Sequence, residues 1–243
     1  MFALKKGRLR VVTRRCFLVP MVMWGGAFSP SAQSERAAWF PDAPTTHRYV
    51  WDDAACATCE ATTPEPEWRH MAALAGVPEV RFMTAPDERR GPAYAIAPDV
   101  VVLSPSARTL PVCQLAFVVG HELVHVARRH FDEDVVALLA FSRLPDHWSE
   151  RGEDAMQLLE HDYGLALRLS EMWQRQEQEA DWLGALLSAE ARGCTVESGA
   201  LAYLRGSRAG GGIGAAHAPS AVRMRKLQPF AESARRLADL APR

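Results

Sequence analysis

The sequence lacks a strong excess of charge of either sign. Its 28 Lys and Arg residues nearly balance 29 Asp and Glu residues, which leaves a formal net charge of −1 at pH 7. A nucleic-acid-binding domain normally carries clustered positive charge, so a nucleic acid partner is not expected. Aromatic residues are also few, at 8%, but 48% of the residues are hydrophobic, which is enough for a core and excludes a disordered chain.

Cysteine is scarce as well. Beyond position 32 the chain has four cysteines, Cys56, Cys59, Cys113 and Cys194. The Cys56-Ala-Thr-Cys59 pair has no His after it and no second pair nearby, which speaks against haem attachment and against a structural zinc knuckle. The even number is typical of an oxidising compartment, and we expect a local Cys56–Cys59 disulfide.

The first 32 residues have the layout of a secretory signal. They contain six cations and no acid, followed by a short apolar run at 16–28 and small residues. Residues 13–18 (TRRCFL) resemble the twin-arginine export signal, although an ordinary signal with a chance Arg pair is an alternative. We expect an exported protein of a bacterial periplasm, or a membrane-anchored one if the signal is not cleaved. No later stretch approaches the ~18 apolar residues that span a bilayer.

Three regions follow from this pattern: a signal peptide at 1–32, an irregular arm at 33–64 and one folded domain at 65–243. Within the domain, short strands are predicted before most of the helices, which indicates a mostly helical α+β fold with a small sheet. The predicted strands lie at 79–83, 93–97 and 100–103. The predicted helices lie at about 65–74, 111–131, 134–142, 163–191 and 196–204, and from 219 onward.

A buried helix is predicted around 115–127, where the only ionisable side chains are His121, Glu122 and His125. Histidines four residues apart share a helix face, so both can bind one ion, and a neighbouring carboxylate can accept a proton from water. This is the His-Glu-x-x-His pattern of zinc peptidases. The alternative is two hydrogen-bonded core histidines beside a surface acid. His130, about 140° round the helix from His125, is predicted to support packing.

The long helix at 163–191 offers further ligands. At about 100° per residue, Glu177 and Asp181 lie on its small, apolar stripe, whereas Glu179 is predicted to face water. Two carboxylates one turn apart on a buried face repel each other. We therefore expect one of them to bind a cation and the other to be hydrogen-bonded to a ligand or a cation. The alternative is a solvated acidic patch.

A second disulfide is predicted between Cys113 and Cys194. Cys113 precedes the His-Glu-x-x-His helix, and Cys194 follows the carboxylate helix directly after Gly193. A bridge between them would tie together the two elements that must meet at the metal.

Together these motifs resemble the HtpX and CAAX-prenyl-endopeptidase family of gluzincin metallopeptidases. The resemblance extends from about Tyr94 to Leu227. It rests on AIAPDVVVLS (95–104), FVVGHELVHVARRH (117–130), EQEAD (177–181) and HAPSAVRMRKL (217–227). It implies a zincin-like domain with one Zn²⁺ per chain and Glu177 as the third ligand. It also implies that His217 and Arg223 lie on the substrate side of the site.

These features predict a zinc endopeptidase that acts on exported or envelope polypeptides. Glu122 would serve as general base and then as proton donor. Asp181 would orient one of the two ligand histidines. An extended substrate is expected to add as a strand at a sheet edge near 100–103. The alternative is a non-catalytic zinc-binding module or a chaperone-like holder of unfolded envelope proteins, which would have no need of Glu122.

The region around His217 has several possible roles. His217 or Arg223 would stabilise the oxyanion, or His217 would occupy the open position of the zinc in a closed state. The preceding stretch at 205–216 is rich in glycine, so it is predicted to be either a mobile gate or a surface linker. The sequence leaves the oligomeric state open.

Overall fold

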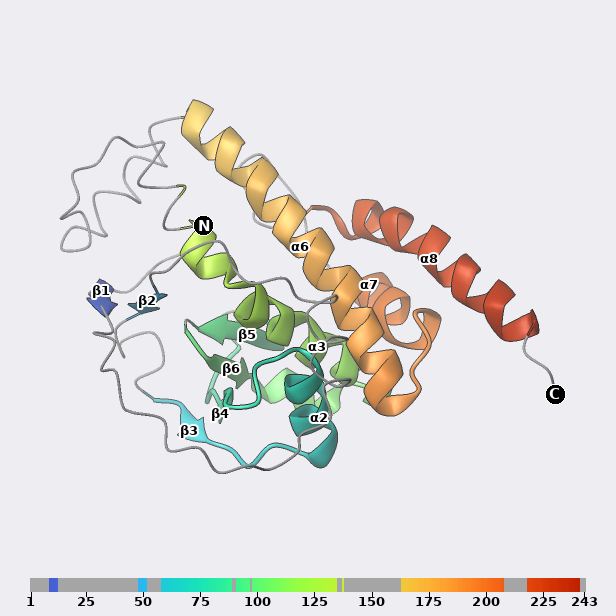
Figure 1. Cartoon of the computed structure of the whole chain (residues 1–243), viewed down its shortest axis with the longest axis horizontal. Helices are drawn as coiled ribbons and strands as arrows, with labels where there is room; N and C mark the ends of the chain where they lie inside the picture. The colour runs from blue at the N-terminus through green and yellow to red at the C-terminus, as the bar shows by residue number, and fades with distance from the viewer. Residues whose placement is uncertain are drawn as a thin grey trace, which may run out of the picture.

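The computed structural model describes residues 9–12, 48–51, 58–88, 91–96, 98–134, 137, 163–207 and 218–240. Its centre is helix α3 (Val112–Arg128), which lies between a four-stranded sheet and the long helix α6 (Tyr163–Arg192) (Figure 1). The buried face of α3 supplies large core side chains, among them Phe117 and Leu123. The predicted α+β fold, mostly helical with a small sheet beside the histidine helix, is confirmed.

The sheet has the strand order β3-β4-β6-β5. Its strands are β3 (Glu60–Ala61), β4 (Arg81–Thr84), β5 (Ala93–Ile96) and β6 (Val100–Leu103). β6 runs parallel to β4 and antiparallel to β5, and all four of its residues are buried. The prediction that an extended substrate adds to a sheet edge near 100–103 is therefore wrong. A continuous apolar run suits a strand paired on both sides, and among the described strands β5 forms the edge beside α3.

The other helices cover α3 and α6. α2 (Pro66–Leu74) packs against both, and the side chains of Trp68 and Met71 are buried on its inner face. A π-helical turn, η4 (Glu197–Leu201), and α7 (Ala202–Gly206) also contact α3. α8 (Ser220–Leu240) lies beside α6 and α7 (Figure 1). A 3₁₀ helix, η2 (Pro105–Thr109), connects β6 to α3.

Two glycines set the spacing between α3 and α6. A Cβ atom on Gly120 would lie 2.8 Å from the carbonyl oxygen of Gly184, and one on Gly184 would lie 2.7 Å from the backbone nitrogen of His121. Since backbone atoms cannot swing aside as side chains do, the two positions admit only glycine without a shift of a helix. The crossing thus brings the histidine helix and the carboxylate helix to contact distance.

The C-terminal end of α3 bends sharply. The helix ends at Arg128, and Arg129 adopts a left-handed conformation with φ 57° and ψ 40°. The structure has a helical turn again at 130–134, so the helix predicted at 111–131 is interrupted at one residue. Because a left-handed non-glycine residue costs about 1 kcal/mol or more, surrounding contacts must hold Arg129 in place.

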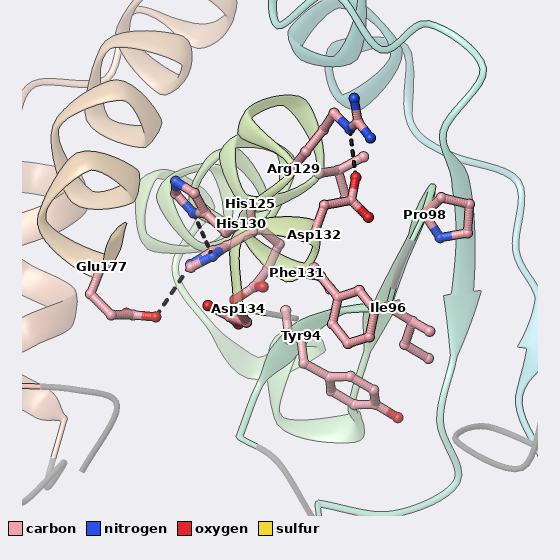
Figure 2. Close-up of a pocket in the computed structure, with 14 residues that line it drawn as sticks. Tyr94, Ile96, Pro98, His125, Arg129, His130, Phe131, Asp132, Asp134 and Glu177 are labelled. Carbon is pink, nitrogen blue, oxygen red and sulfur yellow. Dashed lines mark hydrogen bonds and ion pairs between the residues drawn. The ribbon is translucent and has the colours of Figure 1, made fainter. Parts of the chain in front are cut away.

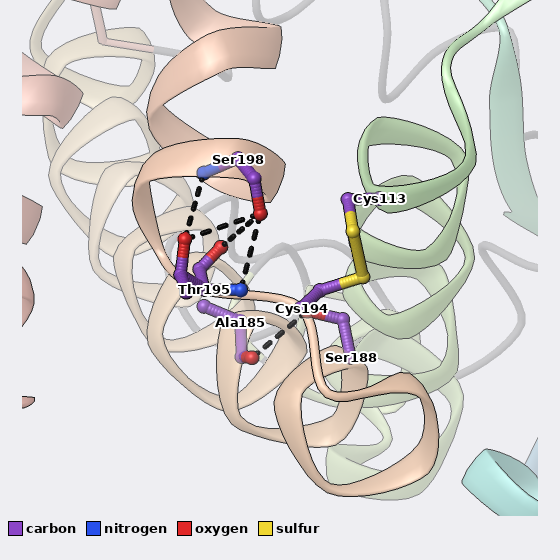
Figure 3. The surroundings of a disulfide bond; sticks show 6 residues. All are labelled: Cys113, Ala185, Ser188, Cys194, Thr195 and Ser198. Carbon is purple, nitrogen blue, oxygen red and sulfur yellow. Dashed lines mark hydrogen bonds between the residues drawn. A yellow bond between two sulfur atoms is a disulfide. The ribbon is translucent and has the colours of Figure 1, made fainter. Parts of the chain in front are cut away.

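A disulfide joins Cys113, in the first turn of α3, to Cys194 (Figure 3). Gly193 ends α6 with a positive φ of 67°, and the chain turns there toward α3. These are the two cysteines that the sequence analysis paired. Cys56 lies outside the described residues, so the Cys56–Cys59 disulfide stays a prediction.

A second, two-stranded sheet pairs β1 (Leu9–Val12) with β2 (Arg48–Trp51) in antiparallel register. β1 lies within the predicted signal, and β2 and β3 lie within the predicted arm, so that arm contains two short strands. The remainder of the predicted signal lies outside the described residues. Among the helices that the structure describes, none has the length and apolar character to cross a bilayer.

Candidate metal centre

Three side chains converge where α3 and α6 cross. The Nε2 atoms of His121 and His125 lie 3.2 Å apart. Glu177 on α6 places Oε2 at 3.2 Å from His121 Nε2 and Oε1 at 3.3 Å from His125 Nε2. The structure thus brings together the three residues that the sequence predicts as ligands, and these ligand atoms form a possible metal-binding group.

The dimensions of this group fit zinc. Tetrahedral Zn²⁺ with bonds of about 2.0–2.1 Å holds neighbouring ligand atoms about 3.3 Å apart. The observed separations of 3.2 to 3.3 Å match that value. Two imidazoles and one carboxylate also form the donor set of a catalytic zinc, which keeps a fourth position for substrate or water.

Behind His121, a carboxylate and a guanidinium complete the arrangement. Oδ1 of Asp181 lies 3.2 Å from His121 Nδ1, the ring nitrogen that faces away from Glu177. Arg223 on α8 donates two hydrogen bonds to Asp181, at 2.8 Å from Nε and 2.5 Å from Nη2. Its Nη2 also lies 3.7 Å from Glu177 Oε2. Arg223 therefore supports the buried carboxylates, while its role in stabilising the oxyanion stays a prediction.

The charges of the group are strongly coupled. Burial opposes protonation of His121, but Glu177 and Asp181 outweigh it and raise the pKa of His121 to about 10. Burial also opposes ionisation of Glu177, yet the neighbouring His121 and His125 hold its pKa well below the ordinary value. Positive charge between these residues is therefore strongly favoured, and a bound cation would supply it.

His125 is backed by a different set of residues. Its Nδ1 lies 3.0 Å from Nδ1 of His130, and the Nε2 atom of His130 lies 3.2 Å from Oε2 of Glu179. Arg128 also forms an ion pair with Glu179. The bond from His130, opposed by burial and aided by Arg128, lowers the pKa of Glu179 to about 2. Burial lowers the pKa of His130.

These contacts correct two expectations. Glu179 does not simply face water, because its side chain is only 31% exposed and is paired with Arg128 and His130. His130 does more than pack, because both of its ring nitrogens have polar partners. The left-handed turn at Arg129 accounts for the position of His130, whereas Arg128 reaches Glu179 from the last residue of α3. No glycine marks this turn in the sequence, so helical periodicity alone could not reveal it.

A cavity of about 260 Å³ opens beside the candidate ligands. Glu122, His125 and Glu177 line it, together with the edge strand β5. Figure 2 shows Tyr94 and Ile96 of β5 grouped with Phe131, opposite His125 and Glu177. Glu122 is half-buried and faces the same space. An apolar wall and a set of titratable groups therefore share one opening. His217 and the glycine-rich positions 208–216 lie outside the described residues.

A model of peptidase family M48 matches residues 64–231 of the chain. The matched region is more than half of the sequence and includes strands β4, β5 and β6, both site helices and Arg223. No curated protein matches the chain.

Proposed function

The chain belongs to peptidase family M48 and is a metallopeptidase, and we propose that it is a zinc-dependent endopeptidase that hydrolyses peptide bonds of exported or envelope proteins. The observation that carries this proposal is the convergence of His121, His125 and Glu177 beside Glu122 in one cavity. Zinc chemistry is supported by the donor set and by the spacing of its atoms.

When bound, Zn²⁺ would polarise the scissile carbonyl and lower the pKa of the attacking water. Glu122 follows His121 on α3 and faces the cavity from beside the ligands. It would accept the proton from water and then donate it to the departing amine nitrogen. Asp181 lies 3.2 Å from His121 Nδ1 and is itself held by Arg223, so this carboxylate would accept the Nδ1 proton and orient the imidazole when the metal is bound.

The position of the edge strand β5 supports the proposal that the substrate is a polypeptide. It pairs with β6 along its inner side and lines the cavity with Ala93–Ile96. An extended peptide could add to its outer side as a further strand, with side chains against Tyr94, Ile96 and Phe131. Such binding uses main-chain hydrogen bonds at many positions, which suits cleavage within a chain rather than only at its end.

Two independent features support export. The first 32 residues have the charge and apolar pattern of a secretory signal. The Cys113–Cys194 disulfide is a feature of oxidising compartments. An export signal and a disulfide in the same chain favour substrates that are themselves exported. Fractionation of cells that produce the full chain tests this part, and recovery of the chain only in the cytoplasm would contradict it.

The test of the mechanism is Glu122→Gln. The amide has nearly the same shape but cannot accept a proton, so we expect stoichiometric zinc with loss of activity on an unfolded protein such as casein. Glu171→Gln, an exposed glutamate on α6, is the matched control and should keep activity. A chelator should abolish wild-type activity and added zinc should restore it. Full activity in the Glu122→Gln variant would refute the assigned base.

A further inference from the structure

We propose that His130 is a positioning residue for the metal ligand His125. It accepts the Nδ1–H hydrogen bond of His125 and is itself held by Glu179 and Arg128, which fixes the tautomer and the ring orientation of the ligand. This inference rests on the metal site of the proposed function. It concerns a side chain that does not itself reach the metal, because it contacts the ring nitrogen facing away from Glu177.

The contacts of the His125 ring assign its proton. Nε2 of His125 lies 3.2 Å from His121 Nε2 and 3.3 Å from Glu177 Oε1, so this nitrogen must offer its lone pair to a metal. A neutral imidazole has one lone pair and one N–H, and the proton must then be on Nδ1. The atom 3.0 Å from this Nδ1 is Nδ1 of His130.

The second imidazole is constrained in the same way. To accept a hydrogen bond, Nδ1 of His130 must carry the lone pair, which leaves the proton on Nε2. That Nε2 lies 3.2 Å from a carboxylate oxygen of Glu179, an acceptor. Arg128 donates to the other oxygen of Glu179. One assignment of protons therefore satisfies every contact from Arg128 through Glu179 and His130 to the metal-facing nitrogen of His125.

The backbone is arranged for this contact. In a continuous helix His130 would lie about 140° away from His125. The left-handed conformation of Arg129 turns the chain, so that His130 faces back toward His125 (Figure 2). A side chain other than glycine is unfavourable there, and such strain is retained where neighbouring contacts require it. His130 is only 3% exposed, which protects its hydrogen bonds from competition by water.

The two ligand histidines thus have unequal supports. His121 contacts the carboxylate of Asp181 directly, and Arg223 holds that carboxylate. His125 instead contacts a neutral imidazole, with the carboxylate and the arginine one step farther away. An anion makes a ligand imidazole more basic than a neutral acceptor does. The role of His130 is therefore chiefly orientation of the ring.

The experiment compares His130→Phe and His130→Asn with the wild type, with Zn²⁺ alone as the probe. Phe keeps a ring but removes the acceptor, whereas Oδ1 of Asn can replace Nδ1 as acceptor. We expect His130→Phe to weaken zinc binding by about 10–100-fold in competition with a chromophoric chelator. His130→Asn should recover most of that loss. His70→Phe, which alters an exposed histidine on α2, is the matched control and should bind zinc normally.

A spectroscopic signature separates positioning from packing. In the zinc-loaded wild type and in His130→Asn, ¹H–¹⁵N NMR should detect a slowly exchanging proton on His125 Nδ1, and in His130→Phe this proton should exchange rapidly. Wild-type affinity in His130→Phe, or equal losses in Phe and Asn, would overturn the inference. Zinc binding without peptidase activity would overturn the proposed function alone, because affinity is measured without substrate.

Discussion

Glu177 contacts both ligand histidines with its two carboxylate oxygens, at 3.2 and 3.3 Å. Its side chain is 8% exposed, and Arg223 lies 3.7 Å from one of its oxygens. A carboxylate buried to this degree is unfavourable unless positive charge surrounds it. At the scale of single residues, the site is therefore a group of buried charges in which each ion needs its partners.

Replacement of Glu177 by Ala should lower zinc affinity by more than about 100-fold, because it removes one of three protein ligands rather than a residue behind a ligand. Equilibrium competition for zinc measures the change. Glu171→Ala, on the exposed side of the same helix, should bind zinc as the wild type does. Unchanged zinc content in Glu177→Ala would mean that the third ligand comes from elsewhere.

At the scale of elements, the crossing of α3 and α6 sets the separation of the ligands. The backbone of Gly184 touches the backbone of Gly120 and of His121, the first ligand. Glu177, the third candidate ligand, lies seven residues before Gly184 on the same helix. A change in the distance between the helices would therefore move His121 and Glu177 apart.

Gly184→Ala should destabilise the fold by about 1–3 kcal/mol, since the new methyl group meets backbone atoms that cannot move independently. It should also weaken zinc binding, because relief of the clash separates the two helices. Urea unfolding and zinc competition measure the two effects. Gly206→Ala is the control, since a Cβ there meets nothing within 4 Å. Normal stability in Gly184→Ala would contradict the close approach.

At the scale of the whole molecule, the disulfide joins the first turn of α3 to the segment that directly follows α6. It links Cys113 to Cys194 across 81 residues of sequence. That interval contains all three candidate ligands, so the covalent bond closes a loop around the site. In the unfolded chain such a bond restricts the loop and thereby favours the folded state.

A Cys113→Ala, Cys194→Ala double variant should lose about 4 kcal/mol of folding free energy in the chain-entropy model, with less if the unfolded chain retains structure. Urea unfolding of the purified proteins measures the loss. A reductant should lower the stability of the wild type toward that of the variant and leave the variant itself unchanged. Equal stability of both proteins without reductant would contradict a stabilising bridge.

The sequence by itself determined the parts of the site that depend on local periodicity. The spacing of His121 and His125 places both rings on one helix face, and the phase of α6 places Glu177 and Asp181 on its buried side. Glu177 and Asp181 are 6% and 2% exposed, as expected. The β-branched run at 100–103 likewise predicted its own strand, because strand propensity and burial act within a few residues.

Only the tertiary structure decided which elements meet. β6 became a central strand rather than the substrate edge, because strand order depends on partners distant in sequence. His130 came to support His125 because Arg129 adopts a left-handed conformation that its own preferences disfavour. Glu179 acquired partners because His130, directly after that turn, and Arg128, the last residue of α3, both lie beside it. At Arg129 long-range packing outweighed a local preference of about 1 kcal/mol, and in all three cases the outcome depends on partners that periodicity alone cannot foresee.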